Sequence, residues 1–212
     1  MSVDAAAHAA HHGAVATWPE DAQFGRASAG KIAMWIFLIS DAFSFFGLLL
    51  AYGILRGESS AWHQPGEPSL GVLLGAGMTA ILIASSVVMI LAFDAKTRGE
   101  GKQASFFLAL AGLLGALFLV GQYAEYFGIF HPGLTKEGLV FGQSAYASSF
   151  YVITGFHALH VFAGLVYIAF ILVRNGGGRS SAGEFELLGL FWHFVDLVWI
   201  FVFTLLYLVP VG

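Results

Sequence analysis

Five stretches of the chain are almost entirely apolar, and each is long enough to cross a lipid bilayer. About 20 residues of α-helix, at a rise of about 1.5 Å per residue, span the roughly 30 Å hydrocarbon core of a membrane. The strands of a membrane barrel would alternate polar and apolar residues, whereas these stretches are apolar on nearly every side. We therefore predict an all-α integral membrane bundle of five transmembrane helices within residues 32–212. The expected helices are Ile32–Leu55, Leu70–Phe93, Ala104–Phe127, Ala145–Val173 and Leu187–Val209.

The composition excludes a water-soluble protein and several kinds of site. Of the 212 residues, 58% are hydrophobic and 10% are charged, whereas about 25% of the residues in an ordinary soluble domain are charged. The formal net charge of −4 provides no positive field, so we expect no nucleic-acid partner. The chain has no cysteine, which excludes disulfides, thiolate metal sites and a cysteine nucleophile.

Residues 1–31 are expected to form a polar N-terminal tail ahead of the membrane domain. His8, His11 and His12 lie in this tail. We interpret them as solvated side chains, because a mobile tail does not hold metal ligands in a fixed geometry.

Basic residues are distributed unequally between the two ends of the predicted helices. Cytoplasmic segments of membrane proteins carry an excess of Lys and Arg, so we expect the N-terminus inside and the C-terminus outside. Arg56 and Lys136 lie at the predicted outer end. The aromatic residues near the ends of the predicted helices are expected in the interface belts: Trp35, Tyr52, Tyr126 and Tyr207. The predicted inner end holds seven of the nine basic residues: Arg26, Lys31, Lys96, Arg98, Lys102, Arg174 and Arg179.

Six ionisable residues lie inside the predicted helices, where a charge costs at least about 2.5–3.5 kcal/mol. At about 100° per residue, each lies on a stripe of polar or small residues, and such stripes face neighbouring helices. The possible roles are proton or ion transport, haem ligation, and hydrogen bonding that fixes the bundle. The six residues are Asp41, Glu125, His157, His160, His193 and Asp196.

The spacing of five of these residues favours structural roles. A haem between two histidines would need a histidine at the depth of His157 or His160 on another helix, and His193 lies closer to the inner side. His193 and Asp196 are three residues apart, which permits a carboxylate–imidazole pair. Glu125 lies near the end of its helix, where water or an interfacial partner can reach it.

Asp41 is the exception, because no basic residue lies within its own predicted helix. A carboxyl group near the membrane midplane is disfavoured as an anion. As a neutral acid hydrogen-bonded near Ser44, Asp41 could exchange a proton with a neighbouring path, which an amide could not do. A structural role and a role in proton chemistry therefore both stay open.

Four motifs resemble those of subunit III of haem-copper terminal oxidases, in the same order and in the corresponding helices. The resemblance covers the chain from about residue 26 to its end. The motifs are LISDAFSFF at 38–46, QYAEY at 122–126, SFYVITGFHALHVFAG at 149–164 and FWHFVDLVWIFVFTLLY at 191–207.

This resemblance implies an accessory subunit in a bacterial inner membrane, bound beside catalytic subunit I together with subunit II and membrane lipids. Oxidases of this type reduce oxygen to water and pump protons with haems and copper held in partner subunits. The chain itself is then expected to hold structural phospholipid but no redox centre, metal or catalytic residue. By the resemblance, Asp41 matches a buried carboxylate that is a candidate for proton uptake or for the contact with subunit I. The remaining intramembrane residues match structural ones: Glu125, His157, His160, His193 and Asp196.

The resemblance leaves the electron donor open. The chain lacks the first two helices of seven-helix members, as many bacterial short forms do. Asp41 is similar to the quinol oxidase branch, whereas the segment 122–125 is similar to the cytochrome c branch, and we expect cytochrome c. The competing classes are a proton-coupled carrier and a small b-type cytochrome. A carrier usually has inverted repeats and Gly- or Pro-broken helices, and the sequence has no evident repeat and no proline inside the helical cores.

Overall fold

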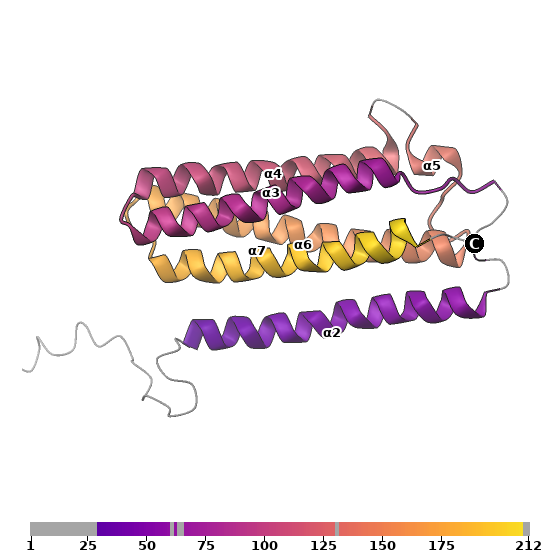
Figure 1. The fold of residues 1–212 in the computed structure, drawn as a ribbon, viewed down its shortest axis with the longest axis horizontal. Helices are drawn as coiled ribbons and strands as arrows, with labels where there is room; N and C mark the ends of the chain where they lie inside the picture. Colours follow the sequence, from indigo (N-terminus) through magenta and orange to yellow (C-terminus); the bar gives the residue numbers. More distant parts are fainter. Residues whose placement is uncertain (1–28, 60–61, 63–65, 130–131, 210–212) are drawn as a thin grey trace, which may run out of the picture.

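A computed structural model describes residues 29–59, 62, 66–129 and 132–209, and all regular secondary structure within them is helical (Figure 1). Five helices are long and apolar enough to cross a membrane, which confirms the predicted all-α membrane bundle. The tail histidines His8, His11 and His12 lie outside the described residues. The five helices are α2 (Ala29–Glu58), α3 (Val72–Thr97), α4 (Gly101–Phe127), α6 (Ala145–Gly176) and α7 (Ala182–Phe203). A short helix α5 (Leu134–Glu137) precedes α6, and a π-helical turn η1 (Thr204–Leu208) extends α7.

Several helices extend beyond the apolar stretches that predicted them. Residues 29–31, which we assigned to the tail, belong to α2, and α7 begins at Ala182 rather than at Leu187. The early start of α7 follows from a capping box, in which Ser181 Oγ accepts from the backbone N–H of Glu184 and the Glu184 carboxylate accepts from that of Ser181. Apolarity thus marks the part of a helix suited to hydrocarbon, whereas capping residues set where the helix begins.

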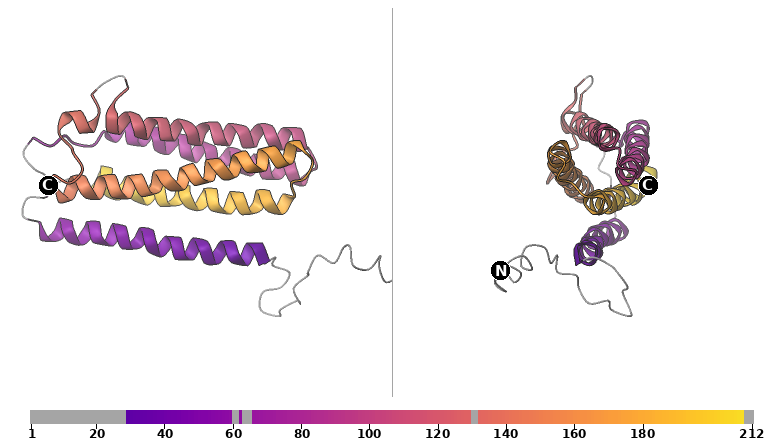
Figure 2. Two further views of the ribbon diagram at one scale, coloured as in Figure 1. Left: turned by 180° about the vertical axis from the view of Figure 1, so that it is seen from behind. Right: turned by 90° about the vertical axis from the view of Figure 1, so that its left-hand side faces the viewer.

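Helices α3, α4, α6 and α7 surround a common core, and α2 lies outside this group (Figure 2). Within the group of four, helices that contact each other run antiparallel. Helix α2 packs against α7, to which it runs parallel, and against α6, to which it runs antiparallel. The sequence of α2 agrees with this position, because a narrow face that includes Leu38, Phe45 and Tyr52 is buried and most of its other large side chains are exposed.

Trp192 of α7 is where the four core helices meet. Its indole Nε1 donates a 2.6 Å hydrogen bond to Ser85 Oγ on α3. A Cβ atom at Gly115 on α4 would lie 2.6 Å from Trp192 Cη2, and one at Gly164 on α6 would lie 2.7 Å from Cζ3. The expected small-residue stripes are confirmed at these positions, because the indole fits only where neighbouring backbones lack side chains.

Polar contacts near both ends of α2 hold it against α7. Lys31 Nζ lies 2.6 Å from Glu186 Oε1, and Tyr52 OH donates a 3.2 Å hydrogen bond to the carbonyl of Leu205. Tyr52 and Tyr207 are only 4% and 6% exposed, so their rings face the bundle rather than the surrounding lipid. Both hydroxyl groups have hydrogen-bond acceptors inside the bundle, and a buried tyrosine usually requires one.

Basic residues meet at the end of the bundle where α2 and α7 begin, which we call the basic end. Lys96 Nζ, on α3, donates to Asn175 Oδ1 at 2.6 Å and to Ser180 Oγ at 3.0 Å. Arg174 of α6 forms a 2.9 Å ion pair with Glu184 of α7. These contacts join the ends of α3, α6 and α7 and fix the connections between them.

Candidate functional site

An aspartate and a histidine meet at the contact between α2 and α6, about midway along both helices. Asp41 Oδ1 on α2 lies 3.1 Å from His160 Nε2 on α6, and their side chains are 9% and 13% exposed. His160 Nδ1 lies 2.8 Å from the carbonyl oxygen of Phe156. Ser44, which we expected near the carboxyl group, instead donates to the carbonyl of Ser40 at 3.3 Å. The structure therefore gives Asp41 an imidazole partner from outside its own helix.

The partners of His160 determine where its protons lie. The Phe156 carbonyl oxygen can only accept, so Nδ1 carries a hydrogen. One further proton then lies between His160 Nε2 and Asp41 Oδ1, either on a neutral carboxyl group or on an imidazolium facing a carboxylate. The pair is electrically neutral in both forms, which lowers the cost of burying it. The arrangement therefore holds one exchangeable proton.

The pair lies close to the membrane midplane if α2 spans the bilayer. Asp41 is twelve residues after Ala29, or about 18 Å along a helix of 30 residues that is about 45 Å long. Asp41 Oδ2 is buried and has no hydrogen-bond partner among the described residues. At this depth water is scarce, so a proton on the pair can leave only through protein groups nearby.

His160 also lines an apolar cleft between α2, α6 and α7, with a volume of about 380 Å³. Met34 and Tyr167 line the cleft about two helical turns nearer the basic end, so the cleft extends from the pair in that direction. Apolar cavities stay dry and accept hydrocarbon, so this cleft suits an acyl chain better than a file of water. Its other lining residues are Phe37, Leu159, Ala163 and Phe191.

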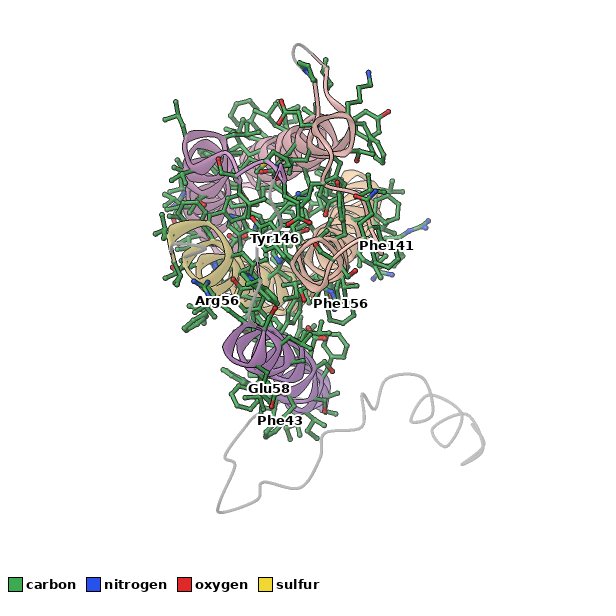
Figure 3. All side chains as sticks on the ribbon, turned by 90° about the vertical axis from the view of Figure 1, so that its right-hand side faces the viewer. Phe43, Arg56, Glu58, Phe141, Tyr146 and Phe156 are labelled. Carbon is green, nitrogen blue, oxygen red and sulfur yellow. The ribbon has the colours of Figure 1, made fainter. Side chains whose placement is uncertain are left out.

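Aromatic rings enclose the pair on the side that faces the bundle. The ring of Phe45 on α2 packs 4.8 Å from Phe156 and 5.1 Å from His160 on α6 (centroid distances). Phe43, on the opposite side of α2, is 71% exposed and points away from the bundle (Figure 3). The α2 helix therefore directs Asp41 inward and a wholly apolar side chain outward.

Glu125 lies in a second polar cluster, at the end of the bundle opposite the basic end. Its Oε2 accepts a 2.7 Å hydrogen bond from Tyr207 OH and a 3.1 Å hydrogen bond from Gln122 Nε2. Tyr207 belongs to the π-helical turn η1, and such turns change which side chains face inward. Glu125 is 3% exposed, so the expectation that water reaches it is wrong.

His157 is fully buried, and neither of its ring nitrogens has a hydrogen-bond partner among the described residues. Its ring lies 4.8 Å from that of Trp199 and 5.5 Å from that of Phe118 (centroid distances). Ring packing, rather than the interhelical hydrogen bond we expected, therefore holds His157.

His193 and Asp196 do not form the direct pair that their spacing allows. His193 Nδ1 lies 2.7 Å from Ser86 Oγ on α3. Ser86 also adjoins Asp196, yet neither carboxyl oxygen of Asp196 has a well-formed hydrogen bond among the described residues. Ser86 could not be recognised from the sequence, because serines in apolar helices usually bond to their own backbone and so have no distinguishing pattern.

The three intramembrane histidines thus have different environments. His160 contacts Asp41 and His193 contacts Ser86 at hydrogen-bond distance, whereas His157 packs among aromatic rings. Across the part of the chain that the structure describes, no three His, Cys, Asp or Glu side chains are arranged to hold a metal ion.

Comparison with known proteins identifies the family of this chain. Residues 21–210, which include all five membrane-spanning helices, match the family described as cytochrome c oxidase subunit III. The chain belongs to this family. Both members of the Asp41–His160 pair lie within the matched region, in the motifs at 38–46 and 149–164.

Individual relatives agree with the family match over most of their length. The chain is 39% identical to cytochrome c oxidase subunit 3 of Synechocystis, over 82% of this chain and 72% of the relative. It is 35% identical to the probable cytochrome c oxidase subunit 3 of Nocardia farcinica, over 82% and 85%. It is 34% identical to cytochrome c oxidase subunit 3 of Corynebacterium diphtheriae, over 89% and 92%. The resemblance derived from the motifs is therefore confirmed, and the chain is a multi-pass membrane protein.

Proposed function

We propose that the chain is the accessory subunit III of a proton-pumping haem-copper respiratory oxidase in a bacterial inner membrane, with cytochrome c as the electron donor. The haems and copper used to reduce oxygen are held in subunits I and II, and this chain stabilises the catalytic subunit I. Family membership over residues 21–210 is the observation on which the proposal rests.

The Asp41–His160 pair is the residue-level basis for a role in proton uptake. It holds one exchangeable proton close to the midplane, and this proton lies in a 3.1 Å hydrogen bond between two helices. In the proposed function the pair exchanges that proton with an uptake path in subunit I, or it fixes the contact with that subunit. It is not an acid acting on oxygen.

The other intramembrane polar residues have structural roles in this proposal: Glu125, His157, His193 and Asp196. Two apolar clefts support a role for phospholipid. Besides the cleft at His160, a cleft of about 710 Å³ lies between α3 and α4 and includes Gly77, Leu117 and Gly121 in its lining. Acyl chains match such surfaces, since the linings are mainly apolar.

Mild purification of the tagged chain tests the function directly. We expect larger subunits to co-purify, a reduced-minus-oxidised spectrum with haem bands, and oxygen consumption with reduced cytochrome c. Consumption with quinol but not with cytochrome c would instead assign the chain to a quinol oxidase. Recovery of the chain alone, without haem, would contradict the proposal and favour an independent carrier.

The basic end is proposed to face the cytoplasm, because it collects most of the Lys and Arg residues. Lys136→Cys, on α5, should react with a membrane-impermeant maleimide added outside intact cells, whereas Arg98→Cys should react only after permeabilisation. Both positions are exposed, and the chain has no cysteine to give a background signal. The reverse labelling pattern would overturn the orientation.

A further inference from the structure

His193 presents an unused hydrogen-bonding atom on the membrane-facing surface of the bundle. Its Nδ1 is occupied by Ser86 at 2.7 Å, whereas its Nε2 has no hydrogen-bond partner among the described residues. The side chain is half-buried, and Nε2 is not one of the fully buried polar atoms that lack a partner, so this second nitrogen is accessible from outside the bundle. A polar atom exposed to hydrocarbon is unfavourable, so the position requires a partner that the chain itself does not supply.

The depth of His193 restricts what this partner can be. The residue lies twelve positions after the N-cap Ser181, or about 18 Å along a spanning helix of 27 residues that is about 40 Å long. It is therefore close to the middle of the bilayer, and lipid headgroups begin about 15 Å away from there. Acyl chains reach this depth, but they offer no hydrogen bond.

The surface around His193 is apolar and shaped as a shallow cleft. The cleft lies between α3 and α7, has a volume of about 140 Å³, and includes Ile90, Phe93 and Leu190 in its lining. Its other ionisable residue, Glu186, is paired with Lys31. Leu197, one turn beyond His193, is 53% exposed. A single hydrogen-bonding position thus lies within an exposed apolar face.

We propose that a transmembrane helix of a partner subunit packs on this α3–α7 face and bonds to His193 Nε2 through a hydroxyl or amide side chain at the same depth. The inference rests on the proposed function, which supplies the partner subunits. Polar bonds of this kind contribute to helix association in lipid, where no hydrophobic force drives two helices together. His193 then binds in two directions, to α3 through Nδ1 and to the partner through Nε2.

Two substitutions of His193 distinguish the bond that Nδ1 makes to α3 from the bond that Nε2 makes to the partner. An asparagine amide can replace Nδ1 but is too short to replace Nε2, whereas a glutamine amide reaches the Nε2 position. The measured quantity is the ratio of bound to released chain after the purified complex is diluted in detergent. We expect His193→Asn to lower this ratio by about three-fold, and by at most about twenty-fold. His193→Gln should retain the chain nearly as well as the wild type.

Ser86→Ala is the matched control, because it removes the internal bond and leaves Nε2 intact. It should retain the chain better than His193→Asn does. Equal losses for Ser86→Ala and His193→Asn, with no recovery in His193→Gln, would mean that the histidine acts only within the bundle, and the inference would be overturned.

Photo-cross-linking tests the surface without changing His193. A benzophenone amino acid at Leu197 should cross-link to another oxidase subunit, whereas one at Leu113, which is 65% exposed on α4, should label lipid. Cross-links from Leu197 to lipid alone or to a second copy of the chain would overturn the inference.

Haem that co-purifies with the wild-type chain is measured first. Its absence defeats the proposed function, whereas haem together with lipid-only cross-links defeats this inference alone.

Discussion

Asp41→Asn should slow oxygen reduction per haem several-fold, or make the activity decay faster during turnover, while the chain stays in the complex. Asparagine has nearly the same shape as aspartate, and its amide can still donate a hydrogen bond to His160 Nε2. It lacks the exchangeable proton that the 3.1 Å bond between Asp41 and His160 holds. The measurement is the rate of oxygen consumption at equal haem content, with the amount of subunit III determined in the same preparation.

Asp41→Leu is the structural control for this experiment. It leaves His160 Nε2 buried without a partner, which costs about 1–3 kcal/mol and should reduce the amount of assembled subunit. His160→Ala should likewise lower assembly without changing the haem spectrum per catalytic subunit. If Asp41→Asn behaves as wild type and only Asp41→Leu loses the subunit, Asp41 is a packing and hydrogen-bonding residue and has no proton role.

Gly164→Ala should greatly reduce the amount of folded subunit. The new methyl group would lie 2.7 Å and 2.8 Å from two ring carbons of Trp192 and 3.2 Å from Phe191 Cε1. Trp192 cannot move aside easily, since it is 1% exposed and bonded to Ser85. Overpacking of this kind costs about 1–3 kcal/mol in a well-packed core. The measurement is the thermal stability of the purified complex together with the amount of subunit III in membranes.

Gly155→Ala is the matched control on the same helix. A Cβ atom there meets nothing within 4 Å, so the substitution should be neutral or slightly stabilising, as alanine is favoured over glycine in helices. A smaller side chain at position 192, as in Trp192→Leu, should partly rescue Gly164→Ala. Equal stability of the two alanine variants would contradict the close packing around Trp192.

The five helices could be predicted from sequence because apolarity along a stretch is a local property. The presence of Asp41, Glu125 and the histidines within these helices could be predicted for the same reason. Their partners could not, since a partner depends on how two helices are rotated and shifted relative to one another. Asp41 and His160 are 119 residues apart along the chain. No periodicity within either helix indicates that they meet.

The polar cluster at Glu125 illustrates a second limit. A regular helix of 3.6 residues per turn places Tyr207 on the same stripe as His193 and Asp196. The π-helical turn η1 breaks this periodicity, and Tyr207 instead contacts Glu125 at 2.7 Å. A local change in helical pitch therefore determines which residue covers Glu125.

The Asp41–His160 pair forms only when α2 docks on the bundle, because its two members belong to different helices. Helices insert into a bilayer one by one and then associate, and lipid solvates an apolar helix as well as another helix does. Before α2 docks, Asp41 is an isolated acid in hydrocarbon and His160 has an empty nitrogen. Docking brings them together along with the contacts of Lys31 and Tyr52. The proton-holding group is thus not inserted with any single helix; it comes into existence when α2 packs against α6.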